Sequence, residues 1–319
     1  MTLTLRNYQT EDDYWRIRAF LREVFLLNGR RELGWQPARL DYWRWDFIAN
    51  WQESDPMEQV TFLWGTPSGE IAAVLNPEVR GDAHLQIHPQ HRAPELLEEM
   101  TVVAEQRLAT PTTPKQRQLR VWVNENDALL QQILIRRGYA RSGLAEKQHY
   151  LPANVPLPDP PVAPGYTVRA LGDVAELPAR SWIVWKAFNP NEPDDHYWGW
   201  EWYRNIQRMP LYRRDLDIVA VAPDGEFASS CILWYDDATR AGYFEPVGTH
   251  PDHLRRGLGK AVMYAAMRRF RDMGGLVAAV GGYTPAANAL YDSVMPLERE
   301  LSEAWGREWL FHRKIRRKS

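Results

Sequence analysis

The two halves of this 319-residue sequence repeat each other at an offset of about 160 residues. The opening stretch LTLRNYQTEDD parallels YTVRALGDVAE, which aligns Arg6 with Arg169. Farther along, QVTFLWGTPSGEIAAV parallels LDIVAVAPDGEFASS, two apolar runs around a hairpin-turn signal. Toward the end of each half, NENDALLQQILIRRGY parallels AANALYDSVMPLERE. A repeat of this length is a whole domain rather than a short solenoid unit, so we expect one fold twice.

A proline-rich segment separates the two repeats. Residues 151–164 read LPANVPLPDPPVAP and contain six prolines. Prolines at that density cannot donate to a strand ladder, and they favour an extended chain. The sequence therefore predicts a domain over residues 1–152, a linker over 153–164 and a second domain over 165–319.

Strand and helix patterns come in the same order in both halves. We expect an α+β fold class, in which each domain has a mixed, mostly antiparallel sheet flanked by helices. The expected helices cover residues 12–27, 40–53, 94–108 and 128–137 in the first half and 174–188, 197–209, 257–273 and 285–294 in the second.

Charge and cysteine content exclude several function classes. Lys and Arg number 39 against 41 Asp and Glu, so no overall field favours nucleic acid. Cys231 is the only cysteine, which excludes an internal disulfide and is typical of a reducing cytosol. No apolar run reaches membrane-spanning length, and the N-terminal residues lack signal-peptide character. We therefore expect a cytoplasmic protein with neither nucleic acid nor membrane as its partner.

The segment RRGLGK, residues 255–260, lies between an apolar run and a helical pattern. Gly257 and Gly259 let the backbone turn tightly and open a helix, whose first N–H groups and positive dipole end favour an anion such as pyrophosphate. The segment is not a P-loop, because alanine follows the lysine, and it is not a dinucleotide fingerprint, because Val262 replaces the third glycine. It indicates either a phosphate site or a strand-to-helix turn without a ligand.

The longer stretch PVGTHPDHLRRGLGKAV resembles the signature of the GCN5-related N-acetyltransferases (the GNAT superfamily), Gln/Arg-x-x-Gly-x-Gly/Ala after a strand. NALY, residues 288–291, is similar to the family helix that lies along the pantetheine arm of acetyl-CoA. The resemblance implies that Asn288 bonds this arm and that loop amides hold the pyrophosphate. The loop positions are Leu254, Arg255, Arg256, Gly257, Leu258, Gly259 and Lys260. Leu254 departs from the family pattern, which places Gln or Arg there.

The first half lacks these glycines. Its counterpart HRAPELLEEM, residues 91–100, has Pro94 and three glutamates instead. Proline removes an N–H group, and carboxylates repel a pyrophosphate. The sequence is thus identified as a tandem member of the superfamily with a degenerate N-terminal copy.

Acetyl transfer to an amine needs a donor to the developing oxyanion, a neutral amine and a proton for the leaving thiolate. The resemblance implies that the strand 242–249 splays from its neighbour and that its backbone holds the acetyl group. Pro246 lacks an N–H, which fits a bulge or splay there. The implied acetyl-binding residues are Val247, Gly248 and Thr249. Tyr291 is the implied general acid, and its alternative is an ordinary buried helix tyrosine.

Glu245 lies on the strand that enters the predicted acetyl site, where some family members place a carboxylate base. Its alternative is a salt bridge with an arginine. Tryptophans, tyrosines and carboxylates between residues 182 and 203 form either a pocket for a cationic amine or part of the core. His250 and His253 lack the further ligands of a metal site, so we expect no metal.

Together these features predict an acetyl-CoA-dependent N-acetyltransferase that transfers acetyl directly to a small amine in a ternary complex. Tyr291 and Glu245 are its candidate catalytic residues. The alternative is a non-catalytic acyl-CoA-binding module with a regulatory or assembly role.

Overall fold

The computed structural model describes residues 2–51, 54–159 and 162–310. Contacts divide the chain into two compact units. The first comprises Met1–Pro37, Gln52–Ala145 and Leu301–Ser319, and the second comprises Ala38–Trp51 and Glu146–Glu300. In both units helices accompany a mixed and mostly antiparallel set of strands, which confirms the predicted α+β fold class.

In the first unit the strands follow the order β1-β2-β3-β4-β6-β13, with β5 beside β6. Neighbours pair antiparallel except β4 and β6, which are parallel. The strands are β1 (Thr4–Asn7), β2 (Phe62–Gly65), β3 (Ile71–Asn76), β4 (Asp82–Ile87), β5 (Thr110–Thr113), β6 (Gln116–Asn124) and β13 (Glu298–Leu310). The helices are α1 (Glu11–Leu27), α3 (Met57–Val60), α4 (Pro94–Arg107) and α5 (Ala128–Arg136).

In the second unit the order is β7-β12-β11-β10-β9-β8. Here β11 and β12 are parallel and the other neighbours antiparallel. The strands are β7 (Ala140–Pro152), β8 (Thr167–Ala170), β9 (Asp217–Val221), β10 (Phe227–Asp236), β11 (Ala241–Thr249) and β12 (Val277–Gly282). The helices are α2 (Pro37–Tyr42), a π-helical turn (Trp43–Ile48), α6 (Leu177–Phe188), α7 (Tyr203–Gln207), α8 (Leu258–Asp272) and α9 (Pro285–Val294).

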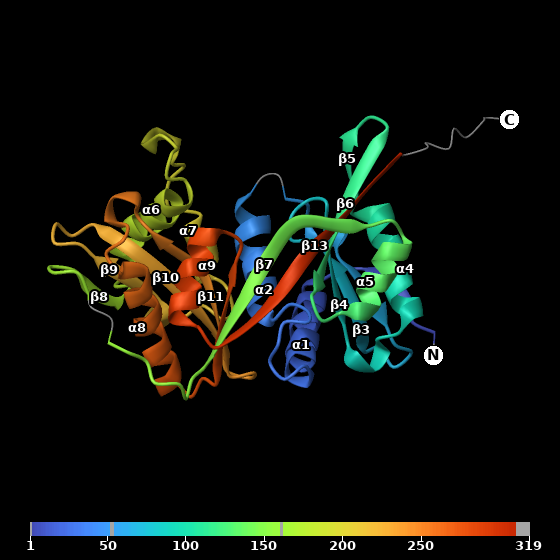
Figure 1. The fold of residues 1–319 in the computed structure, drawn as a ribbon, viewed down its shortest axis with the longest axis horizontal. Helices are drawn as coiled ribbons and strands as arrows, with labels where there is room; N and C mark the ends of the chain where they lie inside the picture. The colour runs from blue at the N-terminus through green and yellow to red at the C-terminus, as the bar shows by residue number, and fades with distance from the viewer. Residues whose placement is uncertain (1, 52–53, 160–161, 311–319) are drawn as a thin grey trace. The chain divides into compact units, whose positions relative to one another are not determined.

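The sheet of the second unit has helices on both faces (Figure 1). Helix α8 packs across β9, β10 and β11, and α9 packs on α8 and β12. The core beneath α8 is apolar, with Leu233, Phe244, Val262 and Phe270 almost fully buried. Helix α6 packs against the other face of β10 and β11. The end of β11 therefore lies between two helical layers.

A buried ion pair fastens α6 to β9. The Nε of Arg180 donates to Asp217 Oδ1 at 2.6 Å, and neither side chain is exposed. The hydroxyls of Tyr203 and Tyr212 donate to the other oxygen of Asp217 at 2.7 and 3.0 Å. One carboxylate thus joins α6, α7 and the segment before β9.

The last strand of the first half of the sequence, β7, pairs with a strand of the second unit. The last strand of the second half, β13, pairs with a strand of the first unit. Lys147–Pro152 of β7 pair with β12, and Ser302–Leu310 of β13 pair with β6. The segment Ala38–Trp51 also belongs to the second unit, although it comes from the first half. The predicted boundaries at 152 and 165 follow the sequence repeat, whereas the compact units follow strand pairing, which side-chain packing between strands decides.

Most predicted helices are present within a few residues of their expected bounds. The prediction of a helix over 197–209 is wrong for its first half, because only Tyr203–Gln207 are helical. Gly199 lies there with φ of 98°, a left-handed conformation that a right-handed helix cannot contain. Over the described ranges, none of the helices combines the length and apolarity that crossing a bilayer requires.

Candidate active site

Strand β11 carries a bulge beside the predicted acetyl site. Cys231 of β10 faces Val247 and Leu233 faces Phe244, so Glu245 and Pro246 together oppose one residue of β10. The predicted bulge at Pro246 is therefore present. The indole Nε1 of Trp234 donates to the carbonyl oxygen of Glu245 at 2.5 Å, which holds the bulge in place. A bulge turns side chains out of the regular alternation, and it directs Glu245 to a cavity.

Beyond the bulge, β11 parts from β12. Over the described residues, β12 pairs with β11 only from Ala241 to Tyr243. The last three residues of β11, Val247, Gly248 and Thr249, thus have β10 on one edge and no strand on the other. Residues 247–249 are only partly buried, and backbone groups on an edge without a strand need another hydrogen-bond partner.

The glycine turn opens α8 directly after this splay. Gly257 occupies the N-cap position with φ of 75°, and no described side chain caps the helix there. A Cβ on Gly259 would lie 3.1 Å from Leu290 Cδ2 and 3.5 Å from Thr249 Oγ1, so a glycine lets α8 approach α9 and β11. The first amides of α8 have no acceptor within the helix and lie at its positive dipole end.

The side chains around this turn differ in their roles. Arg256 Nη1 donates to the hydroxyl of Tyr166 at 2.7 Å, so this guanidinium is already engaged. Arg255 is exposed, Lys260 is half-buried and Leu258 is buried in the core. Leu254 is exposed and extended, and it adds no polar group to the turn.

Helix α9 brings Asn288 and Tyr291 to the same region. The side-chain oxygen of Asn288 is buried close to Gly282, and it has no hydrogen-bond partner among the described residues. Tyr291 is buried beside the cavity. Burial and the nearby carboxylate of Glu245 hold the pKa of the Tyr291 hydroxyl above its usual value, so it stays protonated at neutral pH.

The counterpart of this turn in the first unit is built differently. Helix α4 begins at Pro94, which has no N–H to offer. Glu98 accepts from Arg137 at 2.6 Å, and Glu99 accepts from the indole of Trp64 at 2.9 Å. These glutamates therefore form structural hydrogen bonds at the start of α4. The corresponding start of α8 in the second unit has no side-chain cap among the described residues.

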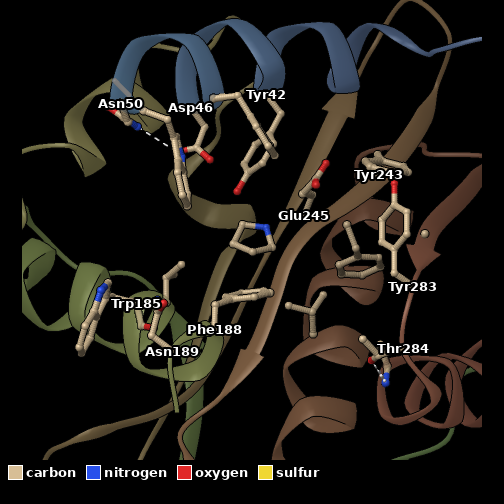
Figure 2. Close-up of a pocket in the computed structure, with 18 of the residues that line it drawn as sticks. Tyr42, Asp46, Asn50, Trp185, Phe188, Asn189, Tyr243, Glu245, Tyr283 and Thr284 are labelled. Carbon is tan, nitrogen blue, oxygen red and sulfur yellow. Dashed lines mark hydrogen bonds between the residues drawn. The ribbon is translucent and has the colours of Figure 1, made fainter. Parts of the chain in front are cut away.

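A cavity of about 420 Å³ lies beside Glu245 and Tyr291 in the second unit. This volume falls in the range of about 300–1,000 Å³ typical of small-molecule sites. In Figure 2, Tyr42 and Asp46 point from the helix above toward the space that Glu245 and Phe188 also face. Much of the wall is aromatic: Phe47, Trp51, Trp185, Phe188, Trp198 and Trp202.

Sequence reasoning missed one wall of this cavity. Tyr42, Asp46 and Asn50 are spaced four residues apart on a helical segment, so they share one face. Trp51 continues the wall. The spacing was a readable signal, but it lies in the half without the glycines, where the sequence predicts only a helix over residues 40–53, of which 52 and 53 lie outside the described residues. A π-helical turn, a feature common at functional sites, spans Trp43–Ile48 here.

The acceptor region predicted between 182 and 203 contributes only in part. Trp185, Trp198 and Trp202 line the cavity. Two of the predicted carboxylates there contact neighbours instead: Asp194 pairs with Lys186 at 2.8 Å, and Glu192 is hydrogen-bonded to His196 at 2.9 Å. Asp46 and Glu245 supply the carboxylates of the cavity in their place, together with Glu146.

Other polar groups have structural partners. His253 is hydrogen-bonded to Tyr166 at 2.7 Å, and His250 accepts from the amide of Asp252. Across the residues that the structure describes, no cluster of three or more potential metal ligands occurs. Cys231 is fully buried in the core, and burial raises the pKa of its thiol.

The sequence from 177 to 295 matches the Acetyltransferase (GNAT) family. A GCN5-related N-acetyltransferase from Sphaerobacter thermophilus is similar in structure, with TM-score 0.64 and 16% identity over 96% of this chain and 95% of that chain. A tandem GNAT protein from the clavulanic acid biosynthesis pathway has TM-score 0.61 and 14% identity over 96% and 98%. A GNAT-family acetyltransferase from Colwellia psychrerythraea has TM-score 0.55 and 11% identity over 95% and 99%. No curated protein matches this sequence significantly.

The family match runs from the first residue of α6 to just beyond α9, so it includes the bulge, the glycine turn and Tyr291. The similar structures extend over both units. Residues 177–295 thus match the GNAT acetyltransferase family, and the fold of the whole chain is similar to that of a tandem GNAT protein.

Proposed function

We propose that this protein is an acetyl-CoA-dependent N-acetyltransferase that transfers acetyl directly to a small amine in a ternary complex. One observation carries the proposal: Glu245 and Tyr291 line the same cavity, beside the open edge of β11. A base for the amine and a donor for the leaving sulfur thus converge on one small-molecule site.

The residues present fit acetyl-CoA. The open N-terminus of α8, with Gly257 and Gly259, suits a pyrophosphate. The buried oxygen of Asn288 has no donor among the described residues, and an amide N–H of a pantetheine arm would supply one. When bound, acetyl-CoA supplies an activated acetyl group as a thioester.

The chain's own groups account for the proton transfers. Glu245 accepts one proton from the ammonium group of the acceptor, which frees the nitrogen lone pair for the new N–C bond. The open edge of β11 at Val247–Thr249 offers amide donors to the oxygen on which charge develops. Tyr291 donates its proton toward the sulfur as the C–S bond breaks, and the second proton of the nitrogen restores the hydroxyl.

Direct transfer is favoured over an acetylated enzyme intermediate. Cys231 is the only cysteine, and it lies in the apolar core beneath α8, away from the lining of the cavity. Its raised thiol pKa further lowers the fraction of nucleophilic thiolate.

The test mixes the full-length protein with acetyl-CoA and a panel of small amines, and it follows free thiol. At least one amine is expected to raise thiol release above the rate without acceptor. If calorimetry shows tight acetyl-CoA binding but no amine raises the rate, the protein is a non-catalytic acyl-CoA-binding module and the proposal is wrong.

Glu245→Gln is expected to lower kcat/KM about 100- to 1,000-fold near neutral pH, because the ammonium loses its proton acceptor. Raising the pH should recover much of this loss, since a larger fraction of the amine is then already neutral. Rate profiles of both proteins between pH 6 and about pH 10 check this. A variant whose deficit is the same at every pH would show that Glu245 is structural.

Asn288→Ala is expected to weaken acetyl-CoA binding about 3- to 10-fold, the effect of losing one hydrogen bond. Stability without acetyl-CoA should stay equal or rise, because the change removes a buried oxygen that lacks a donor and favours the helix. Calorimetry and thermal melting measure the two effects. Unchanged affinity together with a lower melting temperature would give Asn288 a packing role only.

A further inference from the structure

The wall of the cavity formed by Ala38–Trp51 is held firmly in the second unit. Arg39 Nη1 pairs with Glu146 Oε2 on β7 at 2.8 Å, and both side chains are buried. At the other end, Asn205 of α7 donates to the side-chain oxygen of Asn50 at 2.7 Å. Tyr42 packs against Trp234, with ring centroids 6.2 Å apart. Asp46 lies between these anchors and is therefore held in a fixed position.

A donor from its own segment orients the carboxylate of Asp46. Asn50 Nδ2 donates to Asp46 Oδ1 at 2.8 Å. An ionised carboxylate accepts about four hydrogen bonds, so the carboxylate of Asp46 keeps capacity for a further donor. Asp46 lines the cavity, and its side chain points into the space that the other labelled residues surround (Figure 2).

The charge around the cavity favours a cation. Three carboxylates line it, and Arg39 neutralises one of them, Glu146. Within the described ranges, no lysine or arginine lines the cavity. Asp46 therefore contributes a negative potential to the cavity, which a ligand ammonium group would relieve.

The rest of the wall favours an apolar body on the same ligand. Trp51 and Trp198 lie with ring centroids 6.4 Å apart, and Trp185 lies 6.5 Å from Trp198. Phe47 stacks on Trp51 at 6.2 Å. Aromatic faces of this kind bind apolar groups and also attract cations. A strongly hydrated polyol or polyamine would leave these aromatic faces without an apolar partner.

From these contacts we propose that Asp46, supplied by the first half of the chain, binds the ammonium group of an amine acceptor whose body is apolar and of aromatic size. This inference rests on the proposed function, in which Glu245 removes the proton of the same amine. Through Asp46, the first half of the sequence, which lacks the glycine turn, would contribute directly to the specificity for the acceptor.

The proposal is tested by calorimetry, which measures the binding of amines to the full-length protein in the absence of acetyl-CoA. The probes are 2-phenylethylamine and tryptamine, with ethanolamine and spermidine as hydrophilic amines and 2-phenylethanol as a neutral analogue. At least one aromatic amine is expected to bind ten or more times tighter than either hydrophilic amine and than 2-phenylethanol. Asp46→Asn should lower the affinity for that amine at least tenfold and leave the affinity for 2-phenylethanol unchanged. The matched control is Asp272→Asn, at the exposed end of α8, which should change nothing.

Folding of Asp46→Asn is checked by melting at two pH values. Burial raises the pKa of Asp46 to about 6, although donors from Asn50, Tyr42 and Trp51 oppose the shift. Tyr42 is the titratable group whose pKa responds to Asp46, and the charges of Glu245 and Arg180 act on Tyr42 in turn. Above pH 6 the wild type holds a buried charge that the variant lacks, so the variant should melt at or above the wild-type temperature at about pH 8. The difference should vanish at about pH 4, where the carboxyl is neutral.

The outcomes separate this proposal from the proposed function. Aromatic amines that bind in an Asp46-dependent manner but release no thiol would support the present proposal and overturn the function. Thiol release with spermidine or ethanolamine as the best acceptor, unaffected by Asp46→Asn, would support the function and overturn the present proposal. A folded Asp46→Asn protein that binds aromatic amines as tightly as the wild type would also overturn it.

Discussion

Replacing Tyr291 by phenylalanine is expected to lower kcat about 100- to 1,000-fold while the Kd of acetyl-CoA changes by less than about twofold. The ring is buried and keeps its packing in the variant, so the change removes only the hydroxyl. That hydroxyl stays protonated because burial and Glu245 raise its pKa, and it is needed only when charge develops on the sulfur. Steady-state kinetics and calorimetry measure the two quantities separately.

The matched control for this prediction is Tyr264→Phe. Tyr264 lies on α8 in the same core, is buried to a similar degree and does not line the cavity. Its variant should keep wild-type kcat. Equal losses in both variants would mean that any buried hydroxyl near the core matters, and Tyr291 would lose its role as the acid.

Asp217→Ala is expected to lower the free energy of unfolding by about 3–5 kcal/mol, the usual effect of leaving one partner of a buried ion pair alone. Arg180 is fully buried, and its two terminal nitrogens have no hydrogen-bond partner among the described residues, so the bond from Nε to Asp217 is its principal compensation. The hydroxyls of Tyr203 and Tyr212 lose their acceptor as well. Urea unfolding of the wild type and the variant gives the difference.

Asp215→Ala provides the comparison for this stability effect. Asp215 pairs with Arg213 at 3.0 Å, but both side chains are more than 40% exposed. Such surface pairs contribute about 0–1 kcal/mol, so the variant should unfold close to the wild type. If Asp217→Ala is no more destabilised than Asp215→Ala, the buried pair does not fasten α6 to β9.

Local sequence patterns predicted a large part of the fold. Gly257 needs a left-handed conformation that other residues adopt only with strain, so its position before an apolar helical stripe identified the start of α8. Pro246 lacks an N–H, and this alone marked the bulge in β11. These features are readable because each depends on one residue and its immediate neighbours. The residues assigned to acetyl-CoA on this basis stay predictions.

Long-range packing decided what the sequence did not reveal. Nothing local in Lys147–Pro152 indicates that these residues pair with β12, because either unit offers a strand edge and the choice depends on many side-chain contacts. Asp46 was missed for the same reason. Nothing in the sequence of its helix indicates that the helix lies beside the cavity. That position depends on the ion pair between Arg39 and Glu146, which are far apart in the sequence.

The exchange of terminal strands also bears on how such a gene can evolve. Deleting the first 152 residues would remove the strand that pairs with β12 and the segment that carries Asp46, and it would expose a sheet edge prone to aggregation. Selection that maintains the glycine turn therefore preserves the half that lacks one. Because each half of the sequence supplies a strand to the compact unit built mainly from the other half, a truncation at the repeat boundary leaves neither unit complete.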